Sequence, residues 1–320
     1  NNNGGTGYGG EGDNSIDGIG SSAKFDTPGM VTCDGSGNLY VADYKNRCIR
    51  IVNTTTGSVK TVAGSTSNYV EKDGIGVNAG FEFPMGICYN ASTLYVSEAS
   101  VYHTIRKISI PDYRVLTIAG HDSGFSDGSP LSARFFTPFD LVYAGDQLYI
   151  TDYSNNRIRV YTPFSVSTFT TAVSSPIGIT TDNTNLYVTD SHEIHKIVIS
   201  SGAISVIAGS PSSGITDGTG ISAYFNTPSG IAYANGHLYV ADTGNHAIRD
   251  IDISSRNVSL FTGSVSEAGT ANGVGTAARF YSPYGICTDG SYLYVTDYTN
   301  NNIRKINIAT KEVTRLAGAN

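Results

Sequence analysis

The chain has 320 residues but no tryptophan, only two methionines and only 15% charged residues. No stretch approaches the ~18 uninterrupted apolar residues that a membrane helix needs, so we expect no transmembrane segment. The 20 basic residues are outnumbered by 27 acidic ones, which gives a net charge of −7, and there is no basic tract. The electrostatic footprint that binds phosphate backbones is therefore missing, and we expect no nucleic-acid partner.

Cysteine is also scarce. Cys33, Cys48, Cys88 and Cys287 form no CxxC pair and have no metal-ligand spacing, which argues against a zinc ribbon or a thioredoxin-like site. Cys33 and Cys48 are expected two strand spacings of about 4.8 Å apart, beyond disulfide reach. Cys88 and Cys287 occupy equivalent strands of units that are not neighbours. We therefore predict four free, mostly buried thiols.

Glycine and tyrosine are abundant instead, with 37 and 21 residues, and Phe adds 12. This balance excludes a coiled coil or a disordered chain and favours strands joined by glycine turns. The chain starts at an asparagine, within an Asn/Gly-rich lead-in at residues 1–16. We expect this lead-in to be a spacer from a preceding domain or anchor, and the chain to be part of a larger protein.

One short motif recurs six times along the chain. The copies are Leu39 to Asp43 (LYVAD), Leu94 to Glu98 (LYVSE), Leu148 to Asp152 (LYITD), Leu186 to Asp190 (LYVTD), Leu238 to Asp242 (LYVAD) and Leu293 to Asp297 (LYVTD). Before each copy a proline leads into an apolar run, and after it come an Asn-rich turn, an Ile-Arg or Ile-His strand and a last Val/Ile/Thr strand. Each unit thus predicts four short strands.

Four-stranded units repeated around an axis form a β-propeller, because one such sheet cannot bury both of its faces. We predict an all-β, six-bladed propeller of antiparallel blades in one domain, with blades at residues 17–64, 73–120, 127–173, 174–209, 217–263 and 272–318. The proline-led strand, the LYVAD strand and the Asn-Arg-Ile-Arg segment at residues 156–159 resemble NHL repeats, over nearly the whole chain after residue 16.

Five units open with a linker of the form DGxGxxAxFxxP, and only the fourth lacks it. Its phenylalanine is spaced to anchor the linker in apolar surface. Because strands alternate in direction, we expect the linkers and the turns after LYVxD on one face of the disc, which we call the linker face. The acid that closes each LYVxD and the Arg or His of the next strand recur in every unit. Such recurrence indicates turn caps and ion pairs that hold the blades, rather than catalysis.

Positions that differ between units are better candidates for function. In the third unit Asp140 stands where four other units have glycine, next to Phe139, and Tyr284 occupies the position of Phe139 in the sixth. These side chains are expected at the mouth of the central channel. Asp140 would bind a cation or sense a ligand there, and Phe139 and Tyr284 would line an apolar-walled pocket. A solvated channel lining and ordinary blade packing are the alternatives.

Three units place a tyrosine directly after the acid and a cation before the linker phenylalanine. The pairs are Tyr44 with Lys24, Tyr153 with Arg134, and Tyr298 with Arg279. Tyrosine and arginine are enriched at binding hot spots, so we expect these residues to contact a partner on the linker face.

The resemblance also implies an alternative, because related propellers include peptidylhydroxyglycine amidating lyases, which bind zinc through histidine. Candidate ligands are His103, His192 and His246 in second turns, with Asp140 nearby, but their offsets from the LYV strands differ. The favoured expectation is no metal, no cofactor and no catalysis.

We therefore expect a non-catalytic interaction or scaffold module that binds a protein, peptide or glycan, with a sensor domain of a larger receptor as a further alternative. Glycosylation sequons begin at Asn53, Asn90 and Asn257, all in turns opposite the linker face. They favour a secreted or cell-surface glycoprotein.

Overall fold

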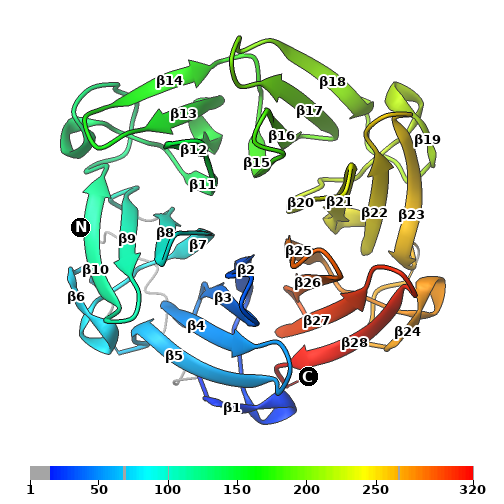
Figure 1. The fold of residues 1–320 in the computed structure, drawn as a ribbon, viewed down its shortest axis with the longest axis horizontal. Helices are drawn as coiled ribbons and strands as arrows, with labels where there is room; N and C mark the ends of the chain where they lie inside the picture. Colours follow the sequence, from blue (N-terminus) through cyan, green and yellow to red (C-terminus); the bar gives the residue numbers. More distant parts are fainter. Residues whose placement is uncertain (1–14, 68–69, 100, 266, 320) are drawn as a thin grey trace, which may run out of the picture.

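The computed structural model describes residues 15–67, 70–99, 101–265 and 267–319. Within these ranges, six antiparallel sheets surround a central axis, as Figure 1 shows. The predicted six-bladed, all-β propeller is confirmed. Of the lead-in, residues 1–14 lie outside the described residues. No helix in the described ranges is long and apolar enough to span a membrane.

Each blade has four antiparallel strands, of which the first lies at the axis and the fourth at the rim. Blades 1 to 3 contain β2 (Pro28–Cys33), β3 (Asn38–Asp43), β4 (Cys48–Asn53) and β5 (Ser58–Gly64); β7 (Pro84–Asn90), β8 (Thr93–Glu98), β9 (Ile105–Ser109) and β10 (Arg114–Ala119); and β11 (Pro138–Ala144), β12 (Gln147–Asp152), β13 (Arg157–Tyr161) and β14 (Val166–Thr170). Blades 4 to 6 contain β15 (Pro176–Thr181), β16 (Asn185–Asp190), β17 (Glu193–Val198) and β18 (Ile204–Gly209); β20 (Ile231–Ala234), β21 (His237–Asp242), β22 (Ala247–Asp252) and β23 (Asn257–Gly263); and β25 (Pro283–Thr288), β26 (Tyr292–Asp297), β27 (Asn302–Asn307) and β28 (Glu312–Ala317).

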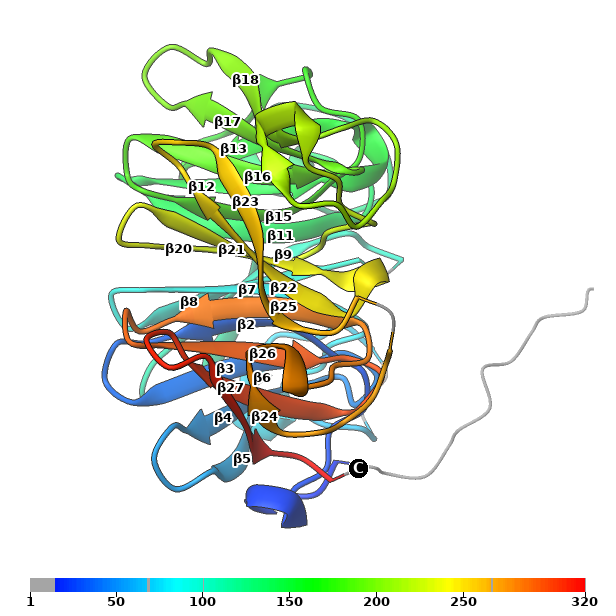
Figure 2. The same ribbon diagram turned by 90° about the vertical axis from the view of Figure 1, so that its right-hand side faces the viewer.

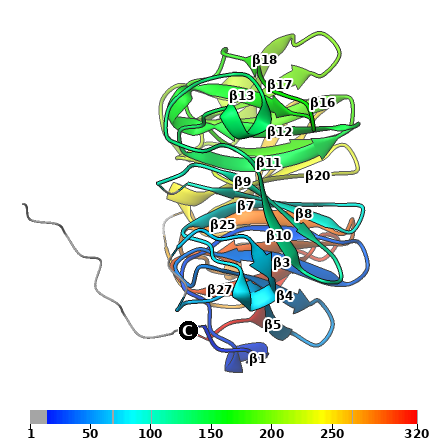
Figure 3. The ribbon, with the colours of Figure 1, turned by 90° about the vertical axis from the view of Figure 1, so that its left-hand side faces the viewer.

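The linkers add short elements outside the fourth strand. Four of them form a two-residue strand on the rim, namely β1 (Gly18–Ile19), β6 (Gly74–Ile75), β19 (Gly218–Thr219) and β24 (Gly273–Val274). One-turn 3-10 helices follow at η1 (Gly20–Ser22), η2 (Gly76–Asn78), η3 (Pro130–Ser132), η5 (Gly220–Ser222) and η7 (Gly275–Ala277), and two more, η4 (Tyr153–Asn155) and η6 (Thr243–Asn245), form second turns. Figures 2 and 3 show the disc edge-on, with linkers on one side and tight hairpins on the other.

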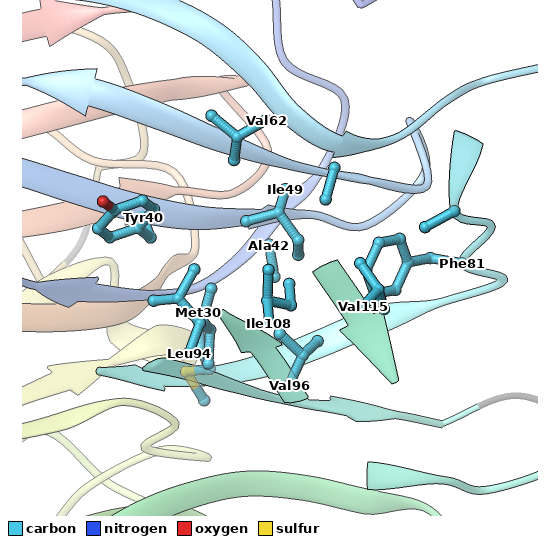
Figure 4. Close-up of a cluster of buried hydrophobic side chains, with 13 residues drawn as sticks. Met30, Tyr40, Ala42, Ile49, Val62, Phe81, Leu94, Val96, Ile108 and Val115 are labelled. Atoms are coloured by element: carbon cyan, nitrogen blue, oxygen red, sulfur yellow. The ribbon is translucent and has the colours of Figure 1, made fainter. Parts of the chain in front are cut away.

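Among the described residues, the core is divided into six apolar clusters, one between each pair of neighbouring blades. Figure 4 shows the cluster between blades 1 and 2, where the linker residue Phe81 packs near Ile49 and Val115. Phe25, Phe135, Phe225 and Phe280 occupy the same place in four other clusters. In the cluster between blades 3 and 4 the short connection supplies Val173 instead, because blade 4 has no linker. The predicted anchoring role of phenylalanine is confirmed.

A buried arginine ties each linker to its blade. Arg50 donates to Asp43 at 2.8 Å and to the linker residue Asp17 at 3.0 Å, and its guanidinium lies 5.0 Å from the Phe25 ring centre. Arg106, Arg159, Arg249 and Arg304 repeat this arrangement in blades 2, 3, 5 and 6. Burial raises the pKa of Asp43 to about 6, although Arg50 opposes the shift. The recurrent acids and arginines are therefore structural, as predicted.

The prediction of four free thiols is wrong for two of them. Cys33 at the end of β2 and Cys287 in β25 form a disulfide, with Cα atoms 6.2 Å apart. Blades 1 and 6 are sequence-distant but adjacent in the ring, and their inner strands converge at the axis. Comparing Cys33 with Cys48, and Cys287 with Cys88, leaves out the pair that closure of the ring brings together. Cys48 and Cys88 are free and buried, as expected.

Candidate functional site

Aromatic rings from opposite sides of the disc meet over the axis on the linker face. Phe139 in β11 and Tyr284 in β25 have ring centres 6.1 Å apart, although blades 3 and 6 lie opposite one another in the ring (Figure 1). Tyr153 packs on Phe139 at 5.7 Å and Tyr298 on Tyr284 at 5.1 Å. We call these four residues the aromatic bridge. They form a row of ring contacts that crosses the axis on this face.

The bridge arises from two repeated positions. The first residue after each proline heads an inner strand at the axis, and in two blades it is aromatic. The residue after the LYVxD acid heads the second turn on the same face, and in the same two blades it is tyrosine. The aliphatic residues Met85 and Ile177 belong to the neighbouring inner strands and pack by the same mouth.

Tyr44 extends this aromatic surface towards blade 2. Its ring lies 5.2 Å from Phe83, and the Arg47 guanidinium covers Phe83 at 5.2 Å. All five predicted rings are partly exposed. Desolvation, with Tyr298 and then Asp140 adding to it, raises the pKa of Tyr284 well above its usual value, so its hydroxyl remains a hydrogen-bond donor. The structure therefore brings together the rings that the sequence placed in separate blades.

The three cations lie on the linkers rather than in the aromatic bridge. Lys24 and Arg134 are exposed, and Arg134 approaches Asp122 at 3.9 Å. Arg279 is more constrained, since it donates to Glu267 at 2.8 Å and to the backbone carbonyls of Thr276 and Ala278. These side chains can supply positive charge around the rim, but Arg279 would first have to leave Glu267.

Asp140 lies directly below the aromatic bridge and is almost fully buried, with 7% exposure. Its Oδ2 accepts the Ile179 N–H of blade 4 at 3.1 Å. Burial raises the pKa of Asp140 to about 7, and the N–H groups of Ile179 and Leu141 oppose that shift. The side chain therefore belongs to the channel interior rather than to the partner-facing surface.

The three candidate histidines do not converge. Each accepts, through Nδ1, the N–H of the residue before the next blade's proline: His103 from Thr137 at 3.2 Å, His192 from Thr227 at 3.1 Å, and His246 from Ser282 at 3.1 Å. Within the part of the chain that the structure describes, no three His, Cys, Asp or Glu side chains gather as a metal site. These histidines therefore link consecutive blades.

This linking role predicts which substitutions His246 tolerates. In blade 6 the equivalent Asn301 accepts the Thr27 N–H at 2.7 Å, also with a left-handed backbone. We expect His246→Asn to keep wild-type stability and His246→Ala to cost about 1–3 kcal/mol, because the Ser282 N–H loses its acceptor. Urea unfolding of both variants measures the difference. Equal stability of the Ala and Asn variants would show that the hydrogen bond is dispensable.

A second inter-blade contact, which the sequence analysis missed, is made by the variable residue of LYVxD. The Thr151 hydroxyl accepts the Asp140 N–H at 2.8 Å and donates to the Ile177 carbonyl of blade 4 at 2.8 Å. Ser97, Thr189 and Thr296 do the same in blades 2, 4 and 6. The available signal was that this position is Ser or Thr in four units and Ala in the other two.

The sequons have the predicted placement. Asn53 ends β4, Asn90 ends β7 and Asn257 begins β23, so all three lie at hairpin turns opposite the linker face. This leaves the aromatic bridge on the face without sequons.

Comparison with known proteins agrees with the repeat pattern. The NHL repeat model matches residues 225–249. The chain is 28% identical to the Arabidopsis thaliana protein SUPPRESSOR OF QUENCHING 1, chloroplastic, over 90% of this chain and 31% of the relative, and 25% identical to human NHL repeat-containing protein 2, over 94% and 41%. It thus spans well under half the length of these curated relatives.

A crystal structure of a Bacteroides thetaiotaomicron protein of unknown function has a similar fold, with a TM-score of 0.73 and 21% identity over 92% of this chain and 72% of that one. The repeat grammar, the six blades and these similarities lead to one conclusion. The chain is a six-bladed β-propeller that has an NHL repeat at residues 225–249 and is similar to NHL repeat-containing proteins.

Proposed function

We propose that the chain is a non-catalytic interaction module that binds a protein, peptide or glycan partner on its linker face, alone or within a larger assembly. The observation that carries this proposal is the aromatic bridge, continued by Tyr44 and Phe83. These rings are partly exposed, come from blades 1, 2, 3 and 6, and lie together over the axis. Rigid rings with polar tips offer a large contact area at low entropic cost.

We further propose an extracellular or cell-surface location. The Cys33–Cys287 disulfide supports it, because structural disulfides persist mainly in oxidising compartments. The sequons support it too, since glycans on the hairpin face would leave the linker face open. Mass spectrometry of the protein secreted from a eukaryotic host tests this: glycans at Asn53, Asn90 or Asn257 are expected, and three unmodified sites would count against it.

The triple variant Tyr44→Ala, Tyr153→Ala, Tyr298→Ala tests the binding surface. The immobilised wild-type chain is screened against a phage-displayed peptide library and a glycan panel, and the affinity of each enriched probe is measured. We expect the triple variant to weaken binding by at least about 30-fold, because the substitutions remove three candidate hot-spot residues.

A matched control changes Tyr89, Tyr143 and Tyr292 to alanine. These tyrosines are also partly buried and in ring contact, but they lie at the hairpin face. Thermal unfolding of both variants separates lost contacts from lost folding. The proposal fails if no probe is enriched, or if the hairpin-face variant loses binding while the linker-face variant retains it.

The zinc-lyase alternative receives no support from the geometry, because His103, His192 and His246 each bond to a different blade-to-blade junction. Metal analysis of the purified chain separates the two functions. Stoichiometric zinc that survives dialysis would favour the lyase over the interaction module.

A further inference from the structure

A cavity of about 210 Å³ lies on the axis beneath the aromatic bridge. The inner strands β2, β7, β11, β15, β20 and β25 all contribute to its wall. Lining residues early in these strands, such as Met30, Ile87 and Asp140, are buried, whereas the later Thr32, Thr180 and Thr288 are partly exposed. The cavity therefore opens on the hairpin face, away from the proposed partner surface, and can be tested separately.

Asp140 is the one carboxylate among the residues that line this cavity, and no Lys, Arg or His lines it. The acids that close the LYVxD motifs differ, because each of them lies within ion-pair distance of an Arg or His. An ionised Asp140 therefore carries a buried negative charge without a counter-cation, which is costly in a low-dielectric interior.

The position of Asp140 also sets it apart. In blade 2 the equivalent residue is Gly86, where an added Cβ would collide with the Phe139 carbonyl oxygen. In blade 3 the side chain fits and bonds to the Ile179 N–H. The N–H groups of Ile179 and Leu141 that bond to this side chain require only an acceptor, and the neutral amide oxygen of asparagine would provide one without a buried charge. The negative charge of the Asp140 carboxylate is therefore not needed for these hydrogen bonds.

The rest of the cavity wall indicates which kind of cation would fit beside the Asp140 carboxylate. Thr32 accepts the Tyr89 N–H at 3.2 Å, and Thr288 donates to the Tyr292 carbonyl at 2.9 Å and accepts the Gly290 N–H at 3.0 Å. Each hydroxyl therefore has a lone pair left, since a hydroxyl oxygen has two. Between the acid and these hydroxyls the wall is aliphatic, with Ile87, Ile179, Ile231 and Ile286.

We propose that this cavity binds a small primary alkylamine as its ammonium ion, which pairs with Asp140, while its alkyl chain packs on the isoleucines and points towards the threonine hydroxyls at the open end. The volume equals that of about seven waters, which limits the ligand to a few carbons. A divalent metal fits less well, because Ca²⁺ takes six to eight oxygen ligands and only one carboxylate lines the site. An amino acid is disfavoured, because its carboxylate would meet no cation.

The test is titration calorimetry of the wild-type chain with butylammonium chloride at about pH 8, against 1-butanol, norvaline and potassium chloride. We expect 1:1 binding of butylammonium, and binding of the other three at least about tenfold weaker. Affinity should fall as pH is lowered to about 6, because protonation removes the Asp140 charge. Cys88, Tyr233 and Tyr284 also face this region, but none is a carboxyl or an imidazole, and burial raises the pKa of Cys88 and Tyr284 well above their usual values.

The decisive variant is Asp140→Asn, which keeps an acceptor for the Ile179 N–H. It should lose at least about tenfold in butylammonium affinity. Asp146→Asn is the matched control, since Asp146 is exposed in the β11–β12 turn of the same blade, and it should bind as wild type.

The proposal also predicts a stability effect that needs no ligand. The raised pKa of Asp140 means that its contribution to folding is lost as pH rises through about 7, so Asp140→Asn should raise the Tm relative to wild type more at pH 8 than at pH 5. The proposal is overturned if butylammonium does not bind, if butanol or potassium binds equally well, or if Asp140→Asn leaves the affinity unchanged.

Discussion

Replacing both Cys33 and Cys287 with serine is expected to lower the free energy of unfolding by about 5 kcal/mol. The disulfide closes a loop across a sequence separation of 254 residues, and the loop-entropy relation gives ~5 kcal/mol for a loop of this size. In the described residues, the sheets of blades 1 and 6 exchange no strand, so this bond is the covalent closure of the ring. Urea unfolding with and without reductant measures the effect.

The ring closure also has non-covalent contacts that set the baseline for this experiment. Thr296 donates to the Gly29 carbonyl, and Asn301 accepts the Thr27 N–H. The control is Cys48→Ser, which alters a buried free thiol of blade 1 without touching the disulfide. If the double variant unfolds within about 1 kcal/mol of wild type, well below the usual 2–5 kcal/mol loss, these contacts alone are sufficient for closure.

The second large effect is expected for Arg249→Leu in blade 5, with a loss of about 3–5 kcal/mol. Arg249 is fully buried and donates to Asp242 at 2.9 Å, to Asp217 at 2.6 Å and to the Tyr224 carbonyl at 2.9 Å. Its removal leaves the fully buried Asp242 carboxylate without a cation to pair with. The linker then loses its attachment to β22, although Phe225 remains in its apolar cluster.

The pH dependence of unfolding tests whether the unpaired Asp242 carboxylate causes the loss of stability in Arg249→Leu. Burial already raises the pKa of Asp242, and loss of Arg249 should raise it further. The folded variant then holds a proton that the unfolded chain releases, so its stability falls as pH rises. Arg249→Leu should therefore be more destabilising at pH 8 than at pH 5, and adding Asp242→Asn should recover part of the loss. An identical loss at both pH values, with no recovery, would assign the effect to packing.

Blade 4 shows how the chain manages without such an arginine. His195 replaces it, with Nε2 at 3.7 Å from Asp190 and 3.3 Å from Glu193. There is no linker acid or phenylalanine to bind, and the N–H groups of Ser174 and Ser175 bond to Asp190 instead. Blade 4 thus lacks both the linker and the arginine. The two are absent together because the arginine of the other blades binds the linker.

The blades and their number could be predicted from the sequence because each strand is encoded locally, by β-branched alternation and turn residues. The anchoring role of Phe81 and the pairing of Arg50 with Asp43 could be predicted because both recur in the units. The disulfide could not, because it joins positions 254 residues apart that only the closed ring brings together.

The candidate site, too, could be predicted only in part from the sequence. Position in the repeat placed Phe139, Tyr153, Tyr284 and Tyr298 on one face, but the sequence could not show that rings from blades 3 and 6 touch across the axis. Nor could it show that Asp140, one residue from Phe139, lines a cavity that opens on the other face, or that the histidines bond to the next blade.

The amino-acid sequence by itself determined the repeating unit, the strand order and the identity of the odd residues, since these depend on interactions within about fifty neighbouring residues. The tertiary structure decided which odd residues meet, because closing the ring sets the distances at the axis and at the junction of the first and last blades. Those distances depend on all six blades at once, and no single unit encodes them.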